Sequence, residues 1–296
     1  MLPDEVLLAI FDFYVDNARI NEWQLLVHVC RRWRSVVFAS PRRLDLRLVC
    51  TSKTPARDTL DVWPPLPLSI ECYGSYPTEQ VDNVITVLKR SDRVCQIHLG
   101  IQGSQMEKVS AAMQEPFPEL IDLLLMSYDG TETVLSDSFL GGSAPRLQSL
   151  RLHRISFTGL PKLLLSAPRL VNLRLFDIPS SGYFLPAALP DLFTLTNLEE
   201  LSIMFQSLPR FFPDWAGRRP PPPTRTVFPA LTRFEFKGTN EYLEDLIARI
   251  DAPRLSGLFI TFFNDNVFET PQFVQFIGRT PTLKTIEKSS VPGVSP

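Results

Sequence analysis

The chain has 296 residues, of which 44% are hydrophobic and 21% charged, so it has enough apolar material for a sizeable core and is not a disordered chain. Its formal net charge of −2 excludes the strongly basic surface of a typical nucleic-acid-binding domain. No stretch reaches the roughly 18 apolar residues of a membrane span, and Met1 to Glu5 lack the basic start of a secretory signal, so the cytoplasm or nucleus is the expected location.

The cysteines all lie in the first third of the chain, each within an apolar stretch, and no two are spaced as a CxxC pair. This pattern predicts small buried thiols in a reducing compartment and no metal site. The cysteines are Cys30, Cys50, Cys72 and Cys95.

Residues 2–15 have the periodicity of an amphipathic helix, because apolar side chains recur three or four positions apart. Pro3 suits the first turn, where a missing N–H costs nothing, and Asp4 and Glu5 suit the positive end of the helix dipole. The apolar positions are Val6, Leu7, Ile10, Phe11 and Tyr14.

A second helical stretch runs from about residue 21 to residue 39, and Ser40 with Pro41 ends it. The register of Trp23 differs from that of Trp33, so the stretch contains either one helix or two. Short helices in a module of about 40 residues do not bury their apolar faces against each other alone and usually need a partner or a neighbouring domain. The segment therefore predicts an interface. Its apolar stripe comprises Leu26, Val29, Cys30, Trp33, Val36 and Val37.

Two motifs in this segment resemble the F-box family. The run LPDE at residues 2–5 opens an apolar helix, as the LPxE start of that family does. The run VCRRW at residues 29–33 matches the family's V-C-[KR]-x-W signature at the distance that the family has. A Trp that often follows the signature near a proline has no counterpart around Pro41, so the junction with the next domain stays open.

The resemblance implies that residues 1–48 dock onto the small Skp-type adaptor of a cullin–RING ubiquitin ligase. A residue-by-residue comparison with the family implies a set of docking or supporting residues, about half of which are equally well explained as internal core, Trp33 above all. The set is Leu2, Pro3, Leu7, Ile10, Phe11, Leu25, Leu26, Val29, Cys30 and Trp33.

Residues 49–93 are less regular than the rest of the chain. A strand is expected within residues 64–72, and the apolar spacing of residues 78–89 predicts a helix. We interpret the segment as one or two irregular capping repeats that join two domains.

Residues 94–296 repeat the pattern apolar-x-x-apolar-x-apolar, mostly with a proline two positions before the first apolar residue. The alternation predicts short strands with one face inward, and the segments between them predict helices, for example at 158–166 and 241–250. Intervals between first positions run from 23 residues (147 to 170) to 33 residues (198 to 231), which resembles the leucine-rich repeat without its usual Asn or Cys. The first positions are Val94, Leu120, Leu147, Leu170, Leu198, Leu231 and Leu255, and an eighth unit starts at Leu283.

The predicted fold is therefore α/β: an N-terminal three-helix F-box followed by a leucine-rich-repeat solenoid, in which strand-plus-helix repeats form a curved parallel sheet. Residues between the inward leucines point out from the concave wall, and our hypothesis is that this wall binds a partner. An ordinary solvated sheet face explains any single residue equally well, although Arg151 and Arg174 would suit a phosphorylated target. The candidate residues are His98, Arg151, His153, Arg174, Phe176, Glu235 and Phe259.

No phosphate-binding loop, nucleophile elbow or metal-ligand motif occurs, so no cofactor, metal or catalytic residue is predicted and the chain is not expected to be an enzyme. The favoured function is substrate recognition in a Skp–cullin–F-box E3 ubiquitin ligase, in which the F-box binds the adaptor, the repeats hold an unidentified target protein, and proximity accelerates ubiquitin transfer. The alternative is a non-catalytic interaction module that binds the adaptor without the full ligase. Neither nucleic acid nor membrane is an expected partner.

Overall fold

The computed structural model describes residues 2–17, 23–41, 43–51, 53, 56–74, 78–179, 195–208, 225–263 and 270–283. Within residues 2–41 the described part forms three helices, α1 (Asp4–Asn17), α2 (Trp23–Val29) and α3 (Arg31–Ala39). Cys30 separates α2 from α3, since its backbone is extended (φ −159°, ψ 169°) and its Sγ accepts a hydrogen bond from the N–H of Trp33 at 3.5 Å. The second predicted stretch is therefore two helices, with Cys30 as the N-cap of the second.

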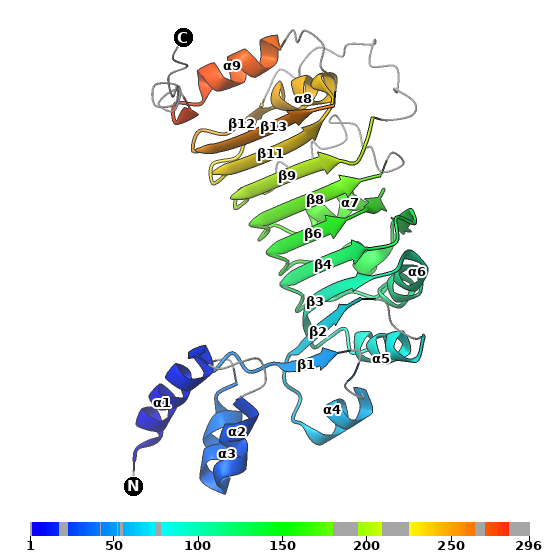
Figure 1. The fold of residues 1–296 in the computed structure, drawn as a ribbon. Coiled ribbons are helices and arrows are strands. Elements are labelled where there is room, and N and C mark those ends of the chain that lie inside the picture. Colours follow the sequence, from blue (N-terminus) through cyan, green and yellow to red (C-terminus); the bar gives the residue numbers. More distant parts are fainter. Residues whose placement is uncertain are drawn as a thin grey trace, which may run out of the picture.

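Nine strands of the described residues form one parallel sheet, which rises from these helices (Figure 1). Each strand pairs with the preceding strand of this sheet, so the chain advances by one strand at every repeat. This arrangement confirms the predicted fold class. The strands are β1 (Leu48–Thr51), β2 (Leu68–Tyr73), β3 (Val94–Ile101), β4 (Asp122–Ser127), β6 (Ser149–His153), β8 (Asn172–Ile178), β9 (Glu200–Phe205), β11 (Arg233–Gly238) and β13 (Gly257–Phe262).

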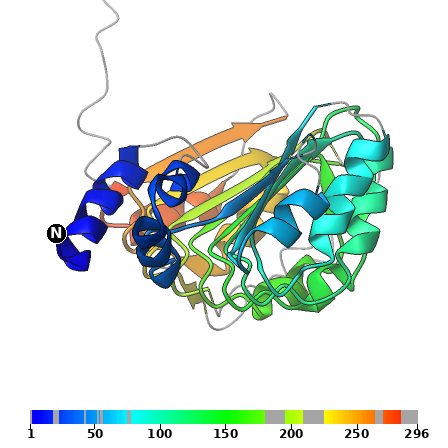
Figure 2. The same ribbon diagram turned by 90° about the horizontal axis from the view of Figure 1, so that it is seen from below.

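Helices and short strands connect the strands of the sheet. Seen along the stack in Figure 2, the connecting helices lie on one side of the sheet and leave its other side open. None of the described helices is long and apolar enough to cross a membrane. The connecting elements are α4 (Ala56–Val62), α5 (Thr78–Leu88), α6 (Gly103–Ala112), β5 (Thr133–Leu135), the 3-10 helix η1 (Phe139–Gly142), β7 (Ile155–Phe157), α7 (Leu160–Leu165), β10 (Thr226–Val227), α8 (Asn240–Ile247), β12 (Ile250–Asp251) and α9 (Pro271–Arg279).

A hydrogen-bonded turn explains the proline that precedes most strands. In the turn before β6 the N–H of Leu147 donates to the carbonyl of Ala144 at 3.1 Å, with Pro145 at the second position, where its fixed φ is favoured. The next N–H, that of Gln148, donates to the carbonyl of Ile121 in the preceding repeat at 2.8 Å. The same pair of bonds recurs before β4, β8, β9, β11 and β13, so the recurring motif both ends one repeat and attaches the next.

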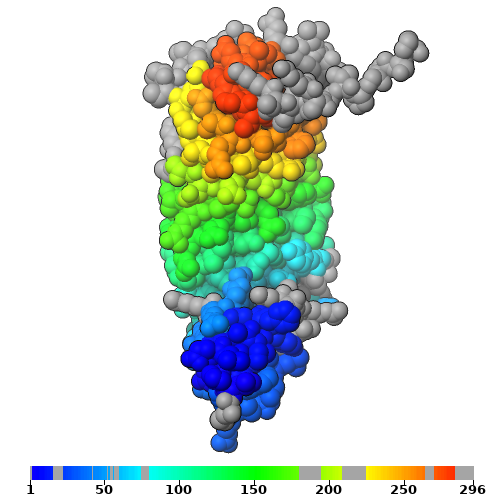
Figure 3. Space-filling view, turned by 90° about the vertical axis from the view of Figure 1, so that its left-hand side faces the viewer, coloured from blue at the N-terminus to red at the C-terminus, as the bar shows by residue number. Residues whose placement is uncertain are grey.

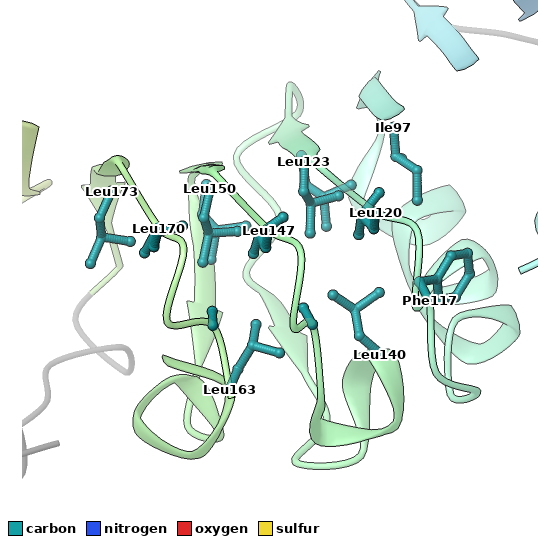
Figure 4. Close-up of a cluster of buried hydrophobic side chains, with 14 of the residues drawn as sticks. Ile97, Phe117, Leu120, Leu123, Leu140, Leu147, Leu150, Leu163, Leu170 and Leu173 are labelled. Atoms are coloured by element: carbon teal, nitrogen blue, oxygen red, sulfur yellow. The ribbon is translucent and has the colours of Figure 1, made fainter. Parts of the chain in front are cut away.

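The inward side chains of successive strands form one continuous core. Leu123, Leu150 and Leu173 are neighbours in register on β4, β6 and β8, and each is no more than 1% exposed. Figure 4 shows them with Leu120 and Leu147 of the preceding turns, all directed into the same interior. Burying one such side chain contributes about 1.5–3 kcal/mol, and only the adjacent repeats provide the burial.

Residues 49–93 continue the same sheet. The predicted strand and helix are present as β2 and α5, and β1 pairs with β2 from Leu48↔Leu68 to Thr51↔Glu71. Strand β1 and helix α4 were not predicted, because four and seven residues are too few for a reliable periodicity. The division of the chain at residues 48 and 93 stays a prediction.

Replacement of Leu150 by Ala should lower the free energy of unfolding by about 2–5 kcal/mol, because the fully buried side chain would leave a cavity that its neighbours fill only partly. The matched control is Leu165→Ala on α7, where the side chain is 46% exposed and the expected change is about 0.5 kcal/mol or less. Denaturant unfolding followed by circular dichroism measures both. Equal losses would contradict the proposed packing.

Candidate functional site

Helix α1 is apolar on two faces. One face carries Leu7 and Phe11, which are 4% and 0% exposed, and Phe11 packs edge to face on Trp33 of α3 with ring centroids 4.8 Å apart. The other face is exposed, with residues three or four positions apart that form one stripe. An exposed stripe of this kind indicates contact with another protein. On α1 the stripe comprises Val6 (41% exposed), Ile10 (47%) and Phe13 (74%), and Leu2 (53%), which precedes the helix, extends it.

Helix α2 has the same arrangement over fewer residues. Leu26 and Val27 are buried in the core, whereas Leu25 and Val29 are 58% and 59% exposed. Because the exposed pair is four residues apart, both side chains leave the same side of α2. Cys30, which follows, is exposed as well.

Ion pairs attach α1 to the segment that follows it. The Nη2 atom of Arg32 lies 2.6 Å from Oδ1 of Asp4, and Arg43 pairs with Asp12 at 2.9 Å. Arg32 also donates a hydrogen bond to the carbonyl of Leu2. Exposed pairs of this kind contribute little energy, about 0–1 kcal/mol each, but these contacts hold the start of α1 against α3.

An aromatic cluster joins α2 and α3 to the start of the sheet. Trp63, which follows α4, has its ring centroid 5.4 Å from that of Trp23 in α2 and 6.4 Å from that of Phe38 in α3. Trp23 Nε1 also donates to the carbonyl of Arg47, just before β1, at 3.1 Å. Edge-to-face pairs add about 0.5–1.5 kcal/mol each beyond burial. The family's Trp near residue 41 is missing in this chain, and Trp63, from farther along the chain, makes the aromatic contact between the helices and the sheet instead. Figure 3 shows the helices protruding at one end of the stack.

We call the side of the sheet that the connecting helices leave uncovered the open face. The residues predicted for the concave wall all lie there, between the inward positions of their strands, and none of them is buried. Phe259 is 53% exposed and the others are half-buried. They are His98, Arg151, His153, Arg174, Phe176, Glu235 and Phe259.

One group of charges on the open face is centred on Asp122. Its Oδ2 atom lies 2.8 Å from Nε2 of His98 and 3.0 Å from Nη2 of Arg151. Burial would raise the pKa of Asp122, but the hydrogen bond with His98 and the positive charge of Arg151 outweigh it, so the pKa lies below its ordinary value. Asp122 therefore stays ionised and neutralises Arg151.

A second group of charges crosses β8, β9 and β11. Arg174 pairs with Glu200, whose Oε1 lies 3.3 Å from Nε of Arg233. Arg233 also pairs with Glu235. Burial alone would raise the pKa of Glu235, but hydrogen bonds from Arg233 and Ser202 outweigh it, so this pKa lies below its ordinary value. Ser202 has the corresponding outward position on β9, and the alternation of the strand predicts that it points into the groove, but its side chain is fully buried because the longer Arg174 and Glu235 flank it in register.

A third part of the open face, near the carboxyl ends of β2, β3 and β4, carries aromatic and thioether side chains. Tyr128 lies over Gly100 of β3, where any Cβ would overlap the tyrosine ring. Tyr73, the register partner of Gly100 on β2, is 44% exposed, and Tyr128 is 43% exposed. The row continues in register through Met126, His153 and Phe176.

The cysteines have no common role in this arrangement. Cys50, Cys72 and Cys95 are buried thiols, and burial raises the pKa of Cys50 to about 11. Cys30 departs from the predicted burial because it caps α3 at the surface. In the part of the chain that the structure describes, no three His, Cys, Asp or Glu side chains are placed to hold a metal ion.

The N-terminal helices with their two exposed stripes correspond to a known domain. Residues 1–47 match the F-box-like family model. The match ends just before β1, so the F-box-like domain consists of α1, α2, α3 and the segment that leads into the sheet. No curated protein matches the chain in sequence. An F-box-like domain implies binding of a Skp-type adaptor, which agrees with the exposed stripes.

Burial separates the residues that the sequence assigned to adaptor docking. Leu7, Phe11 and Leu26 are core residues that can only support the surface, and Trp33 is half-buried against Phe11. A direct docking role stays a prediction for the exposed members, Leu2, Pro3, Ile10, Leu25, Val29 and Cys30.

Two exposed residues of α1 were absent from the predicted docking set. Val6 and Phe13 extend the stripe of Leu2 and Ile10, and Phe13 has the largest exposed fraction of the four. The helical spacing of residues 2, 6, 10 and 13 could have identified them, whereas the family motif alone could not, because it includes neither position.

Replacement of Asp122 by Asn should lower stability near neutral pH, because it removes the anion that pairs with His98 and Arg151. A carboxyl group with a depressed folded-state pKa stabilises the fold above its unfolded-state pKa of 3.8, and this contribution is lost as the pH falls through the folded-state pKa. The difference between wild type and variant in denaturant unfolding should therefore be largest near pH 7 and shrink below about pH 4.

Asp45→Asn is the matched control, because Asp45 also pairs with an arginine but its side chain is 74% exposed. We expect it to change stability little at either pH. A loss in Asp122→Asn that is independent of pH would contradict the ion-pair assignment.

Proposed function

We propose that this protein is a substrate-recognition subunit of a Skp–cullin–F-box E3 ubiquitin ligase. The observation that carries the proposal is the exposed apolar stripe of α1 within a domain that matches the F-box-like family. The F-box-like domain binds the Skp-type adaptor, and the repeats of the sheet, which we take to be degenerate leucine-rich repeats, hold a target protein. The expected location is the cytoplasm or nucleus.

Adaptor docking buries the exposed stripes and leaves the core of the domain unchanged. At about 25 cal/mol per Å² of apolar surface removed from water, several half-exposed Leu, Ile and Val side chains supply the main driving force. The core residues Leu7, Phe11, Leu26 and Trp33 set the angle of α1 on α3, so they determine the shape that the adaptor meets. The docking residues are Leu2, Pro3, Ile10, Leu25, Val29 and Cys30, with Val6 and Phe13 added.

The contribution to ubiquitin transfer is proximity. A separate conjugating enzyme, brought by the cullin scaffold, transfers ubiquitin to a lysine of the bound target, and the local concentration replaces a bimolecular encounter. Target position relative to the adaptor then depends on the junction between the domains. Trp63 packs against Trp23 and Phe38, which supports a constant orientation of the open face relative to the docking helices.

The exchange of Ile10 or Leu25 for Asp should weaken adaptor binding at least about tenfold, because each places an unpaired carboxylate in a desolvated interface. Val134→Asp on β5 is the matched control, since Val134 is an apolar residue of similar exposure, 51%, outside the F-box-like domain. Titration calorimetry with purified adaptor measures the affinities, and circular dichroism checks folding. If all three variants bind alike, the adaptor does not dock on these stripes.

The pair Leu2→Ala and Pro3→Ala tests membership of the ligase in cells. We expect the wild-type full chain to copurify both adaptor and cullin, and the double variant to lose both, because these exposed residues precede α1 at the docking surface. Leu165→Ala, outside the domain, should retain both. Recovery of adaptor without cullin from the wild-type chain would instead indicate an interaction module that works without the full ligase.

A further inference from the structure

We propose that the open face recognises an uncharged polypeptide segment with large apolar side chains, bound at Tyr73, Tyr128 and Met126 beside Gly100. This inference rests on the proposed function, because it names the chemistry of the target that the repeats hold. It differs from the alternative that Arg151 and Arg174 suggest in the sequence, which is a phosphorylated or acidic segment.

The arginines at the centre of the open face are already neutralised. Arg151 lies 3.0 Å from Asp122, and Arg174 pairs with Glu200 on the next strand. A phosphate that approached either guanidinium would meet the repulsion of the adjacent carboxylate as well as the attraction of the arginine. Charge complementarity therefore favours a partner without net charge.

The geometry of the two guanidinium groups leads to the same conclusion. The Nε atoms of Arg151 and Arg174 are buried and have no hydrogen-bond partner. The edge formed by Nε and its neighbouring Nη is therefore closed to an incoming phosphate, although arginine uses such forks for bidentate recognition. The remaining donors are the Nη atoms, and Nη2 of each arginine already pairs with a carboxylate, Asp122 or Glu200.

The side chains of Tyr73, Tyr128 and Met126 form what we call the apolar patch, and their composition is that of a recognition surface. Gly100 has no side chain, so the ring of Tyr128 rests directly on strand β3, and Tyr73 and Met126 are the register partners of Gly100 on either side. Tyrosine rings that are 43–44% exposed offer a large contact area at a low cost in conformational entropy, since each has only two side-chain torsions. Such residues are enriched among those that dominate binding energy.

The charges nearest to this patch also disfavour an anionic partner. Glu71 lies two residues before Tyr73 on the same face of β2, and Arg151 and its partner Asp122 are both close enough to influence Tyr73, so the two negative charges outnumber the one positive charge. Burial and the charge of Glu71 raise the pKa of Tyr73 and outweigh the charge of Arg151, so its ring presents an uncharged surface. An uncharged segment with aromatic or long aliphatic side chains suits both properties.

The test uses the purified full chain, probed with an array of short peptides, each synthesised in unmodified and serine-phosphorylated form. We expect the bound peptides to be uncharged and rich in aromatic or aliphatic residues, with no gain from phosphorylation and little loss of affinity at high salt. Binding that requires acidic or phosphorylated residues, affinity that falls steeply with salt, or an array without any bound peptide would overturn the proposal.

Variants locate the site. Tyr73→Ala and Tyr128→Ala should each weaken binding of the selected peptides at least about tenfold. Gly100→Ala should weaken it as well, with an unchanged unfolding midpoint, because its Cβ meets only the outer end of the exposed Tyr128 ring, which can move away. Val227→Ala, 53% exposed on β10, is the control and should bind as wild type does. Equal affinity of Tyr128→Ala and the control would remove the patch as the site.

Adaptor affinity, measured on the same variants, separates this inference from the proposed function. Variants of the patch should keep the adaptor, and Ile10→Asp should lose the adaptor while it keeps the peptides. A chain that binds peptides as expected but never binds adaptor would leave the inference standing and contradict the ligase role.

Discussion

Each repeat of this protein buries its inward strand residues only because the next repeat covers them. Leu123, Leu150 and Leu173 stand in register on successive strands, and none could be buried within its own repeat. The turn before each strand of the sheet from β4 on, with its N–H bonded to the preceding repeat, sets the spacing that aligns these leucines. The open face exists because the same alternation directs every second side chain away from that core.

The N-terminal helices, unlike the repeats, leave part of their apolar surface uncovered. A domain this small has too little interior for its apolar residues, so α1 uses Leu7 and Phe11 for its own core and leaves Leu2 and Ile10 exposed. The aromatic cluster around Trp63 then connects this domain to the sheet. The buried residues therefore give the domain its shape, and the exposed stripe supplies the surface for a second protein.

The charged side chains of the open face are paired with one another, so this face does not attract a partner through net charge. Arg151 and Arg174 are register neighbours, and each pairs with a carboxylate on its other side, Asp122 on β4 or Glu200 on β9, so that these charged side chains lie half-buried in neutral pairs. Specificity on such a surface comes from the shape and the apolar contacts around it more than from net charge. Gly100 contributes to this shape because it has no side chain, since a larger residue would displace the ring of Tyr128.

The sequence by itself determined the fold class, the positions of the sheet strands from β2 on and the F-box-like motif, because proline turns, leucine alternation and a short signature are local patterns. It could not separate Phe11 from Ile10, which are adjacent and both apolar, since only packing on Trp33 makes one core and the other surface.

Nor could the sequence show that Arg151 and Arg174 are neutralised, or that Trp63 fills the junction. Their partners lie tens of residues away in the chain and become neighbours only through the stacking of repeats. Contacts between repeats and between domains are therefore what the tertiary structure alone decided.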